Sequence, residues 1–165
     1  MRRLQTRVVL DNTVISSLHL AGALSRVLLL WHRRCTVPLQ VRDEAAAWKA
    51  YGPAAVAILS RLESEGALEF ATPAIGPEGA LFSLLQRTRG EGESAAIAVA
   101  HYHGCAVATD DRQARQSCNE LTPPVPTLST EQLLAAAVED GLLGISQAKT
   151  IWAATGISNP SRRIG

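Results

Sequence analysis

Short apolar runs alternate along the chain with longer stretches in which apolar residues recur at helical spacing. The short runs predict strands at residues 7–10, 35–37, 68–71, 105–109 and 125–128. The longer stretches predict helices at residues 14–20, 23–32, 41–51, 53–61, 77–86, 94–103, 131–140 and 146–154, with two further turns after Asp111. Strands that alternate with helices are typical of an α/β protein. We therefore expect a three-layer α/β/α sandwich around a central parallel sheet of about four to five strands.

Length and composition fit one soluble domain with a single core. The chain has 165 residues, of which 47% are hydrophobic and only 4% aromatic, a balance that suits helices packed on a sheet. We predict one domain over residues 1–157 and a flexible tail at 158–165. No apolar run is long enough to span a membrane, and the N-terminus is a poor secretory signal. We therefore expect a cytoplasmic protein without a membrane partner.

The cysteines disfavour two kinds of structure, and the charge leaves the partner open. The three cysteines are widely spaced, and none forms a Cys-x-x-Cys pair. This spacing argues against a disulfide framework and against a zinc ribbon. The net charge is only +1, so composition alone does not call for a nucleic-acid partner. Most basic residues are arginines, several in pairs; they suit phosphate, but a genome rich in arginine codons would give the same pattern.

Acidic residues gather where the predicted strands end. Asp11 follows the first strand, and Asp110 and Asp111 follow the fourth. We expect Glu44 in about the first turn of the helix after the second strand, and Glu93 at the start of the helix before the fourth. All these positions lie at the carboxyl edge of a parallel sheet, where function gathers. Each pair of carboxylates about 4 Å apart repels by roughly 4 kcal/mol. A set of oxygen ligands with this repulsion favours Mg²⁺ or Mn²⁺, ions that activate water for attack on phosphorus.

Each of these acids also has an ordinary structural interpretation. Asp11, Asp110 or Asp111 could simply cap the helix that follows it. Glu93 could be a first-turn acid that stabilises the helix dipole, and Glu44 could belong to a solvated face. The combination of four independent positions at one edge favours a shared site over four separate structural roles.

Four segments, in order, resemble the motifs of the PIN-domain family. Residues 8–15 (VVLDNTVI) resemble its opening strand and aspartate, and residues 41–44 (VRDE) its second motif. Residues 90–100 (GEGESAAIAVA) are similar to a Gly-x-Gly-Glu form of the third motif found in one bacterial branch. Residues 109–115 (TDDRQAR) resemble the fourth, a Thr-x-Asp segment. The resemblance covers residues 8–115; the remaining helices are interpreted on their own, as core or as a dimer surface, with core favoured.

The resemblance implies a metal-dependent ribonuclease that cleaves RNA phosphodiester bonds with Mg²⁺ or Mn²⁺. It implies catalytic residues and metal ligands at Asp11, Glu44, Glu93 and Asp111, with Asp110 as a further or alternative ligand. The residues that would support them by hydrogen bonds are Thr13 and Thr109. Glu93 stands where many members have Asp, which leaves the number and spacing of metal ions open. Because many small bacterial members are VapC-like toxins of toxin–antitoxin pairs, it further implies a homodimer and a small antitoxin partner.

Two alternatives remain beside this interpretation. The first is a catalytically inactive PIN-like module that binds RNA or a protein partner, and the need for a divalent metal distinguishes it from an enzyme. The second concerns the partner surface. Residues 23–24 and 27–28 are apolar at helical spacing, and we hypothesise that they form an accessible groove for a second copy or an antitoxin.

Overall fold

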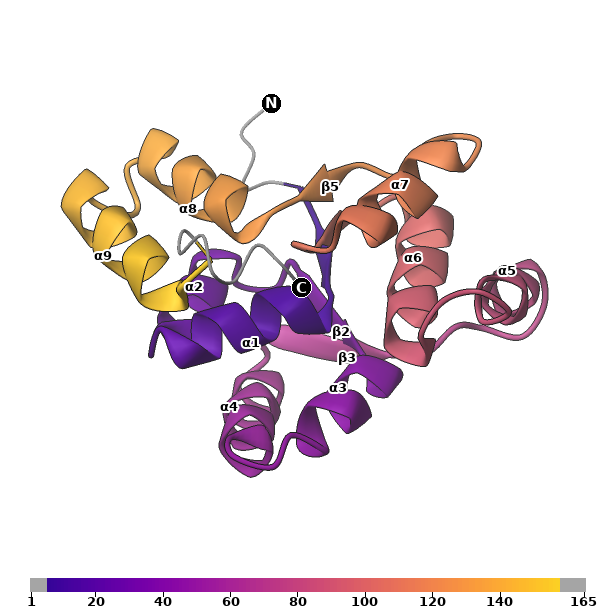
Figure 1. The fold of residues 1–165 in the computed structure, drawn as a ribbon, viewed down its shortest axis with the longest axis horizontal. Coiled ribbons are helices and arrows are strands. Elements are labelled where there is room, and N and C mark those ends of the chain that lie inside the picture. Colours follow the sequence, from indigo (N-terminus) through magenta and orange to yellow (C-terminus); the bar gives the residue numbers. More distant parts are fainter. Residues whose placement is uncertain (1–5, 158–165) are drawn as a thin grey trace.

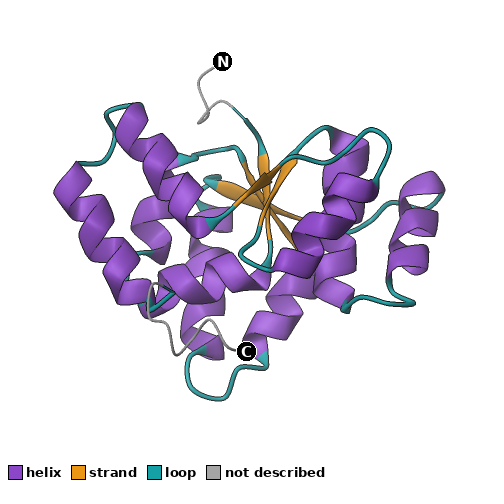
Figure 2. Cartoon of the chain, turned by 45° about the horizontal axis from the view of Figure 1, so that its top comes forward, coloured by secondary structure: helices purple, strands orange, loops and turns teal. Residues whose placement is uncertain are grey.

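Five strands form one sheet at the centre of the computed structural model, which describes residues 6–157 (Figures 1 and 2). All neighbouring strands run parallel, in the order β3-β2-β1-β4-β5. Their bounds are Val8–Leu10 (β1), Cys35–Pro38 (β2), Leu68–Ala71 (β3), Ala106–Ala108 (β4) and Thr127–Leu128 (β5). The predicted α/β fold with a parallel sheet is confirmed. The predicted tail at 158–165 lies outside the described residues.

The described part of the chain has nine helices, of which seven lie in the connections between strands and two follow β5. They are α1 (Asn12–Leu20), α2 (Leu24–Leu30), α3 (Leu39–Ala46), α4 (Gly52–Ser64), α5 (Pro77–Leu85), α6 (Glu91–His103), α7 (Arg112–Glu120), α8 (Thr130–Glu139) and α9 (Ile145–Thr155). None of these described helices combines the length and the apolar character that a membrane crossing requires.

The two faces of the sheet carry separate cores, because side chains along a strand alternate between faces. Val8 and Leu10 belong to the larger core, which α1, α2, α4, α8 and α9 complete. Val9 and Val107 belong to the smaller core, with residues of α6 and α7. Figure 2 shows the sheet between these two groups of helices, and Figure 1 shows α5 outermost, beside α6. The α/β/α layering is therefore as expected.

The hypothesis of an accessible groove on the second helix is wrong. Ala23, Leu24, Val27 and Leu28 are at most 3% exposed and belong to the larger core. Their helical spacing reflects the packing of α2 against the sheet and against α1 and α4. Farther along the chain, Leu133, Leu134 and Leu143 are also buried, so the C-terminal helices contribute to the domain core, whereas Leu142 is 53% exposed.

Two helix boundaries differ from the prediction in ways that bear on the acidic residues. The helix predicted at 41–51 begins earlier, at Leu39, directly after Pro38, and ends at Ala46. Glu44 is therefore the sixth residue of α3. The prediction that it lies in about the first turn of this helix is wrong. The helix α3 contacts α1, α4 and α6 (Figure 1), which brings Glu44 to the start of α6. The first helix begins at Asn12, immediately after Asp11, two residues before the predicted start.

Candidate functional site

The ends of β1 and β4 bring together two segments that are almost one hundred residues apart in the sequence. These strands pair in parallel, with Leu10 opposite Ala108. The pairing continues past the strands, because the backbone N–H of Asp11 donates to the carbonyl of Ala108 over 3.0 Å. Asp11 therefore lies beside Thr109, at the carboxyl edge where the sequence places the acidic cluster.

The Asp11 carboxylate is only 5% exposed and is held by hydroxyl groups. Thr109 Oγ1 donates to its Oδ2 over 2.9 Å, and Thr13 Oγ1 donates to the same oxygen over 3.3 Å. The backbone N–H of Asn12 also donates to this carboxylate. Its side chain makes no capping bond to α1, so the simple capping interpretation of Asp11 is wrong. Burial raises the pKa of Asp11, while these hydrogen bonds, led by that from Thr109, oppose the rise.

Both hydroxyl groups are themselves fixed by backbone amides of the segment after β4. The N–H of Asp110 donates to Thr13 Oγ1 over 2.9 Å, and the N–H of Asp111 donates to Thr109 Oγ1 over 3.1 Å. Each hydroxyl thus accepts from the backbone and donates to the carboxylate. The position of Asp11 is consequently determined by both strand ends.

Glu44 is held between the starts of α1 and α6. Asn12 Nδ2 donates to its Oε2 over 2.6 Å, and the backbone N–H of Gly92 donates to its Oε1 over 2.7 Å. A Cβ atom at position 92 would lie 2.5 Å from Oε2, closer than van der Waals contact allows. A glycine is therefore required here for the close approach of the carboxylate to the first turn of α6.

Glu93 follows in the same turn, and its environment is less complete. Its Oε1 is buried and accepts no hydrogen bond within the described residues; Arg89 Nε lies 3.8 Å from it. Burial, followed by the negative charges of Asp111, Asp11 and Glu44, raises the pKa of Glu93 to about 7 against the partial opposition of Arg89. The repulsion shows that these four carboxylates share one electrostatic environment.

The two adjacent aspartates after β4 have different partners. Asp110 accepts from the N–H of Thr130 over 2.8 Å and from its Oγ1 over 2.6 Å, and so joins β4 to the first turn of α8. Asp111 accepts from the N–H of Gln113 over 2.8 Å and caps α7. Only Asp111 is among the charges that raise the pKa of Glu93. The sequence analysis considered each aspartate as a cap for the helix that follows it, and this is the role of Asp111. Asp110 instead binds the start of α8, twenty residues farther along the chain.

Three residues of the site were given no role by the sequence analysis: Asn12, Arg89 and Gly92. The signal for Gly92 was present, because the Gly-x-Gly-Glu spacing places a residue without a side chain immediately before Glu93. Arg89 lies four residues before Glu93, the separation at which side chains meet along one helix face. Asn12 gave no separate signal, because its contact depends on the position of α3.

The donor set suits a hard divalent cation. The nearby ligand atoms are carboxylate oxygens, and the Oδ1 of Asn12 is a second buried oxygen that accepts no hydrogen bond within residues 6–157. In that part of the chain, no group of three or more Asp, Glu, His or Cys side chains is arranged so that it could hold a metal ion, and there is thus no preformed cage. Mg²⁺ does not need such a cage, because it commonly keeps several waters and binds one or two carboxylates. The carboxylates of Asp11, Glu93 and Asp111, with Glu44 beside them, are the charged oxygens that such an ion would meet at this edge.

Comparison with known proteins gives one match of long extent. Residues 7–154 match the family model DUF3368, described as a PIN domain. The match includes every acidic residue of the site and extends through most of α9. No curated protein matches the chain.

Proposed function

This chain belongs to the PIN-domain family, whose members are generally nucleases, and we propose that it is a metal-dependent endoribonuclease that cleaves RNA. The observation that carries the proposal is the convergence of Asp11, Glu44, Glu93 and Asp111 at one edge of the sheet. Four separate segments supply these carboxylates: the end of β1, α3, the start of α6 and the start of α7. Their mutual repulsion is unfavourable for folding, so a shared cation is the simplest reason for the arrangement.

Mg²⁺ or Mn²⁺ would be held by Asp11, Glu93 and Asp111, with the Oε1 of Glu93, which accepts no hydrogen bond within the described residues, as one ligand atom. When bound, such an ion lowers the pKa of a water and stabilises charge on phosphate oxygens. In hydrolysis, a water oxygen forms a bond to phosphorus, the P–O bond to the leaving nucleotide breaks, and the leaving oxygen takes up a proton.

The chain's own residues position the carboxylates for this reaction. Thr109 and Thr13 hold Oδ2 of Asp11, so that the carboxylate does not turn away when the ion is absent. Asn12 and the Gly92 N–H hold Glu44 in the same way. Preorganised groups of this kind need no rearrangement during the reaction, which is a main source of enzymatic rate enhancement. The homodimer, the toxin role and the antitoxin partner stay predictions.

The proposal is tested with purified protein and a mixed set of labelled RNAs, in Mn²⁺, in Mg²⁺ and in EDTA. Asp11→Asn removes one ligand, and Asp43→Asn is the matched control, because Asp43 is exposed and pairs only with Arg42 among the described residues. We expect cleavage to need metal and to fall at least about 100-fold in Asp11→Asn, while Asp43→Asn cleaves as the wild type does.

If no RNA is cleaved, a second readout distinguishes a protein without a metal site from an enzyme whose RNA substrate is not in the set. Mn²⁺ should raise the Tm of the wild type and of Asp43→Asn, and should raise that of Asp11→Asn much less. Cleavage that persists in EDTA, or that is equal in Asp11→Asn, would overturn the proposal. RNA binding without cleavage and without any metal-dependent change in Tm would identify the non-catalytic binding module instead.

A further inference from the structure

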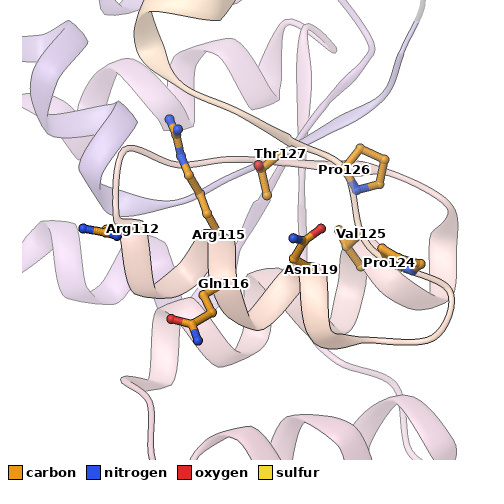
Figure 3. A pocket seen from close by; sticks show the side chains of 8 residues that line it. All are labelled: Arg112, Arg115, Gln116, Asn119, Pro124, Val125, Pro126 and Thr127. Carbon is orange, nitrogen blue, oxygen red and sulfur yellow. The ribbon is translucent and has the colours of Figure 1, made fainter.

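A pocket of about 660 Å³ lies between α7 and the segment that leads into β5, next to the acidic site. Its lining comes from one side of α7 and from residues 124–127 (Figure 3). In Figure 3, Arg112 lies at one end of the pocket, while Asn119 and Pro124 lie toward the other. Since Arg112 directly follows Asp111, the pocket begins beside the acidic site and extends away from it along the helix.

The helix presents hydrogen-bond donors to this pocket. Arg112, Arg115, Gln116 and Asn119 all line it, at the spacing of three, four and seven residues that places side chains on one helix face. No carboxylate is among the lining residues. Within the described part of the chain, the side chains of Arg112 and Asn119 make no hydrogen bond or ion pair. Their donors are therefore available to a ligand.

Arg115 connects this pocket to the acidic site. Its Nε and Nη2 donate to the carbonyl oxygen of Thr109 over 3.3 and 3.2 Å, while the hydroxyl of the same threonine donates to Asp11. The guanidinium group is therefore fixed in orientation and keeps further N–H groups for a ligand. A group bound to Arg115 would have a defined position relative to Asp11.

The opposite wall of the pocket is fixed by backbone hydrogen bonds. The N–H of Val125 donates to the carbonyl of Cys118 over 3.0 Å and ties the segment to α7. The carbonyl of Pro126 accepts from the N–H of Val107 over 2.9 Å and ties the same segment to β4. The pocket is thus preformed, and binding would not require the wall to fold first.

We propose that this pocket binds the phosphodiester backbone of a single-stranded RNA substrate, next to the bond that is cleaved. The inference rests on the proposed function. A polyanion is repelled by the carboxylates at the sheet edge, so cationic donors nearby are needed to hold it, and arginine is the side chain whose geometry matches phosphate. Asn119 adds a neutral donor and acceptor suited to ribose or to an unpaired base, and Gln116, whose Nε2 donates to Glu120 over 3.0 Å, adds an amide oxygen. The volume exceeds that of one phosphate, which favours a nucleotide unit.

The test measures RNA affinity apart from cleavage. All proteins carry Asp11→Asn and are kept in EDTA, and a labelled single-stranded RNA of about the length of one site is titrated at several salt concentrations. Arg112→Gln removes a donor, and Asn119→Asp places a carboxylate in the pocket. Arg26→Gln is the matched control, because it makes the same change in net charge at an exposed position on α2.

We expect Arg112→Gln and Asn119→Asp each to raise the Kd about threefold to tenfold. The slope of log Kd against log salt should fall by about 0.7 for Arg112→Gln, the loss of one phosphate contact on a single strand. Arg26→Gln should change neither quantity. If all three variants changed the Kd equally, or if none did, the assignment of the pocket to RNA would be overturned. Metal-dependent cleavage by the wild type would still support the proposed function in that case.

Two further arms separate the proposals. RNA binding that depends on Arg112 in a protein without metal-dependent cleavage would support the pocket and overturn the nuclease. Matching single-stranded DNA is the remaining competitor. If it binds more tightly than the RNA, and with the same sensitivity to Arg112→Gln, the assignment of the pocket to RNA is wrong.

Discussion

The two sides of the acidic edge hold their carboxylates in different ways. On the β1 side, Asp11 is almost fully buried, and its Oδ2 accepts from both Thr13 and Thr109. At the start of α6, Glu93 is only partly buried, and its Oε1 accepts no hydrogen bond among the described residues. The first carboxylate is satisfied by the protein. The second lies among negative charges with only Arg89 to oppose them.

This difference separates a carboxylate that the protein itself holds in position from one whose buried oxygen accepts no hydrogen bond within the described residues. Asp11 is kept in place whether or not a cation is present, because its donors belong to the strand ends. Glu93 has an oxygen that accepts no hydrogen bond within the described residues and has only the 3.8 Å contact with Arg89 Nε, and a cation would relieve both its burial and its repulsion. We therefore expect substitutions of the threonines that hold Asp11 to act mainly through stability, and substitutions of Glu93 and the residues around it to act mainly through metal binding and activity.

The largest effect on stability should come from Thr109→Val, which keeps the shape of the side chain but removes its hydroxyl. Asp11 loses its shorter hydroxyl donor, and the N–H of Asp111 loses its acceptor. Because Thr109 is fully buried, water cannot replace either bond, and we expect a loss of about 2 to 4 kcal/mol in the free energy of unfolding. Urea denaturation in EDTA measures it.

Thr150→Val is the control for this substitution. Thr150 lies on the exposed side of α9, and its hydroxyl donates only to the carbonyl one turn earlier, so its removal should change the free energy of unfolding by less than about 0.5 kcal/mol. Similar losses in both variants would mean that the hydroxyl network around Asp11 does not hold the strand ends together.

The sequence predicts this part of the molecule well, and the reason is geometric. Val8, Val9 and Leu10 form a short apolar run that is typical of a buried strand, which predicts the residue after it at the sheet edge. The strand predicted at 105–109 ends at the same edge with Thr109 as its last residue, whereas β4 ends one residue earlier, at Ala108. Local patterns therefore place Asp11 and Thr109 without knowledge of the tertiary structure.

The α6 side is harder to predict, because its contacts depend on the packing of helices. Glu44 contacts Gly92 because α3 begins at Leu39 and packs against α6. The sequence predicted that this helix begins two residues later. The α7 pocket is harder still. Arg112 and Asn119 are ordinary exposed helix residues in the sequence, and the wall opposite them comes from a loop whose path no local pattern fixes.

Gly92→Ala tests whether the close contact at the start of α6 is needed for activity. The added methyl group would overlap the Glu44 carboxylate, which must move and give up the Gly92 N–H. We expect cleavage to fall about 10- to 100-fold, without a large loss of stability, because alanine favours the helix more than glycine does. The measurement is kcat/KM in Mn²⁺ together with the Tm in EDTA.

Gly90→Ala provides the comparison, since a Cβ at position 90 meets no atom within 4 Å. This variant should keep nearly wild-type activity and lose only a few tenths of a kcal/mol at the helix start. If both glycine variants lost activity equally, the requirement would concern the flexibility of the segment and not the position of Glu44.

Asp110→Ala distinguishes the two adjacent aspartates. Asp110 accepts two bonds from Thr130 and anchors α8, so its removal should cost about 1 to 2 kcal/mol of stability, the range of a lost helix cap. Well below its Tm, the variant should retain most of its metal-dependent cleavage. Asp43→Ala is the exposed control. Complete loss of cleavage in a folded Asp110→Ala protein would assign the metal to Asp110.

The smallest effect should be a pH dependence of stability in the protein without metal. The pKa of Glu93 rises from 4.5 to about 7 because of burial and of the charges on Asp111, Asp11 and Glu44, with Arg89 opposing. Between these two values the folded state binds a proton that the unfolded state has released. The stabilisation associated with that proton is fully present below pH 4.5 and is lost as the pH rises through about 7.

The wild type in EDTA should therefore lose more Tm between pH 5 and pH 8 than Glu93→Gln does, by an amount kept small by the solvent exposure of the side chain. Glu91→Gln is the control, because Glu91 lies exposed in the same helical turn, and it should follow the wild type. Mn²⁺ at pH 8 should restore the Tm of the wild type and of Glu91→Gln. It should raise the Tm of Glu93→Gln by a smaller amount. Parallel pH profiles for all three proteins would mean that Glu93 is as well satisfied as Asp11, and the contrast between the two sides of the site would not hold.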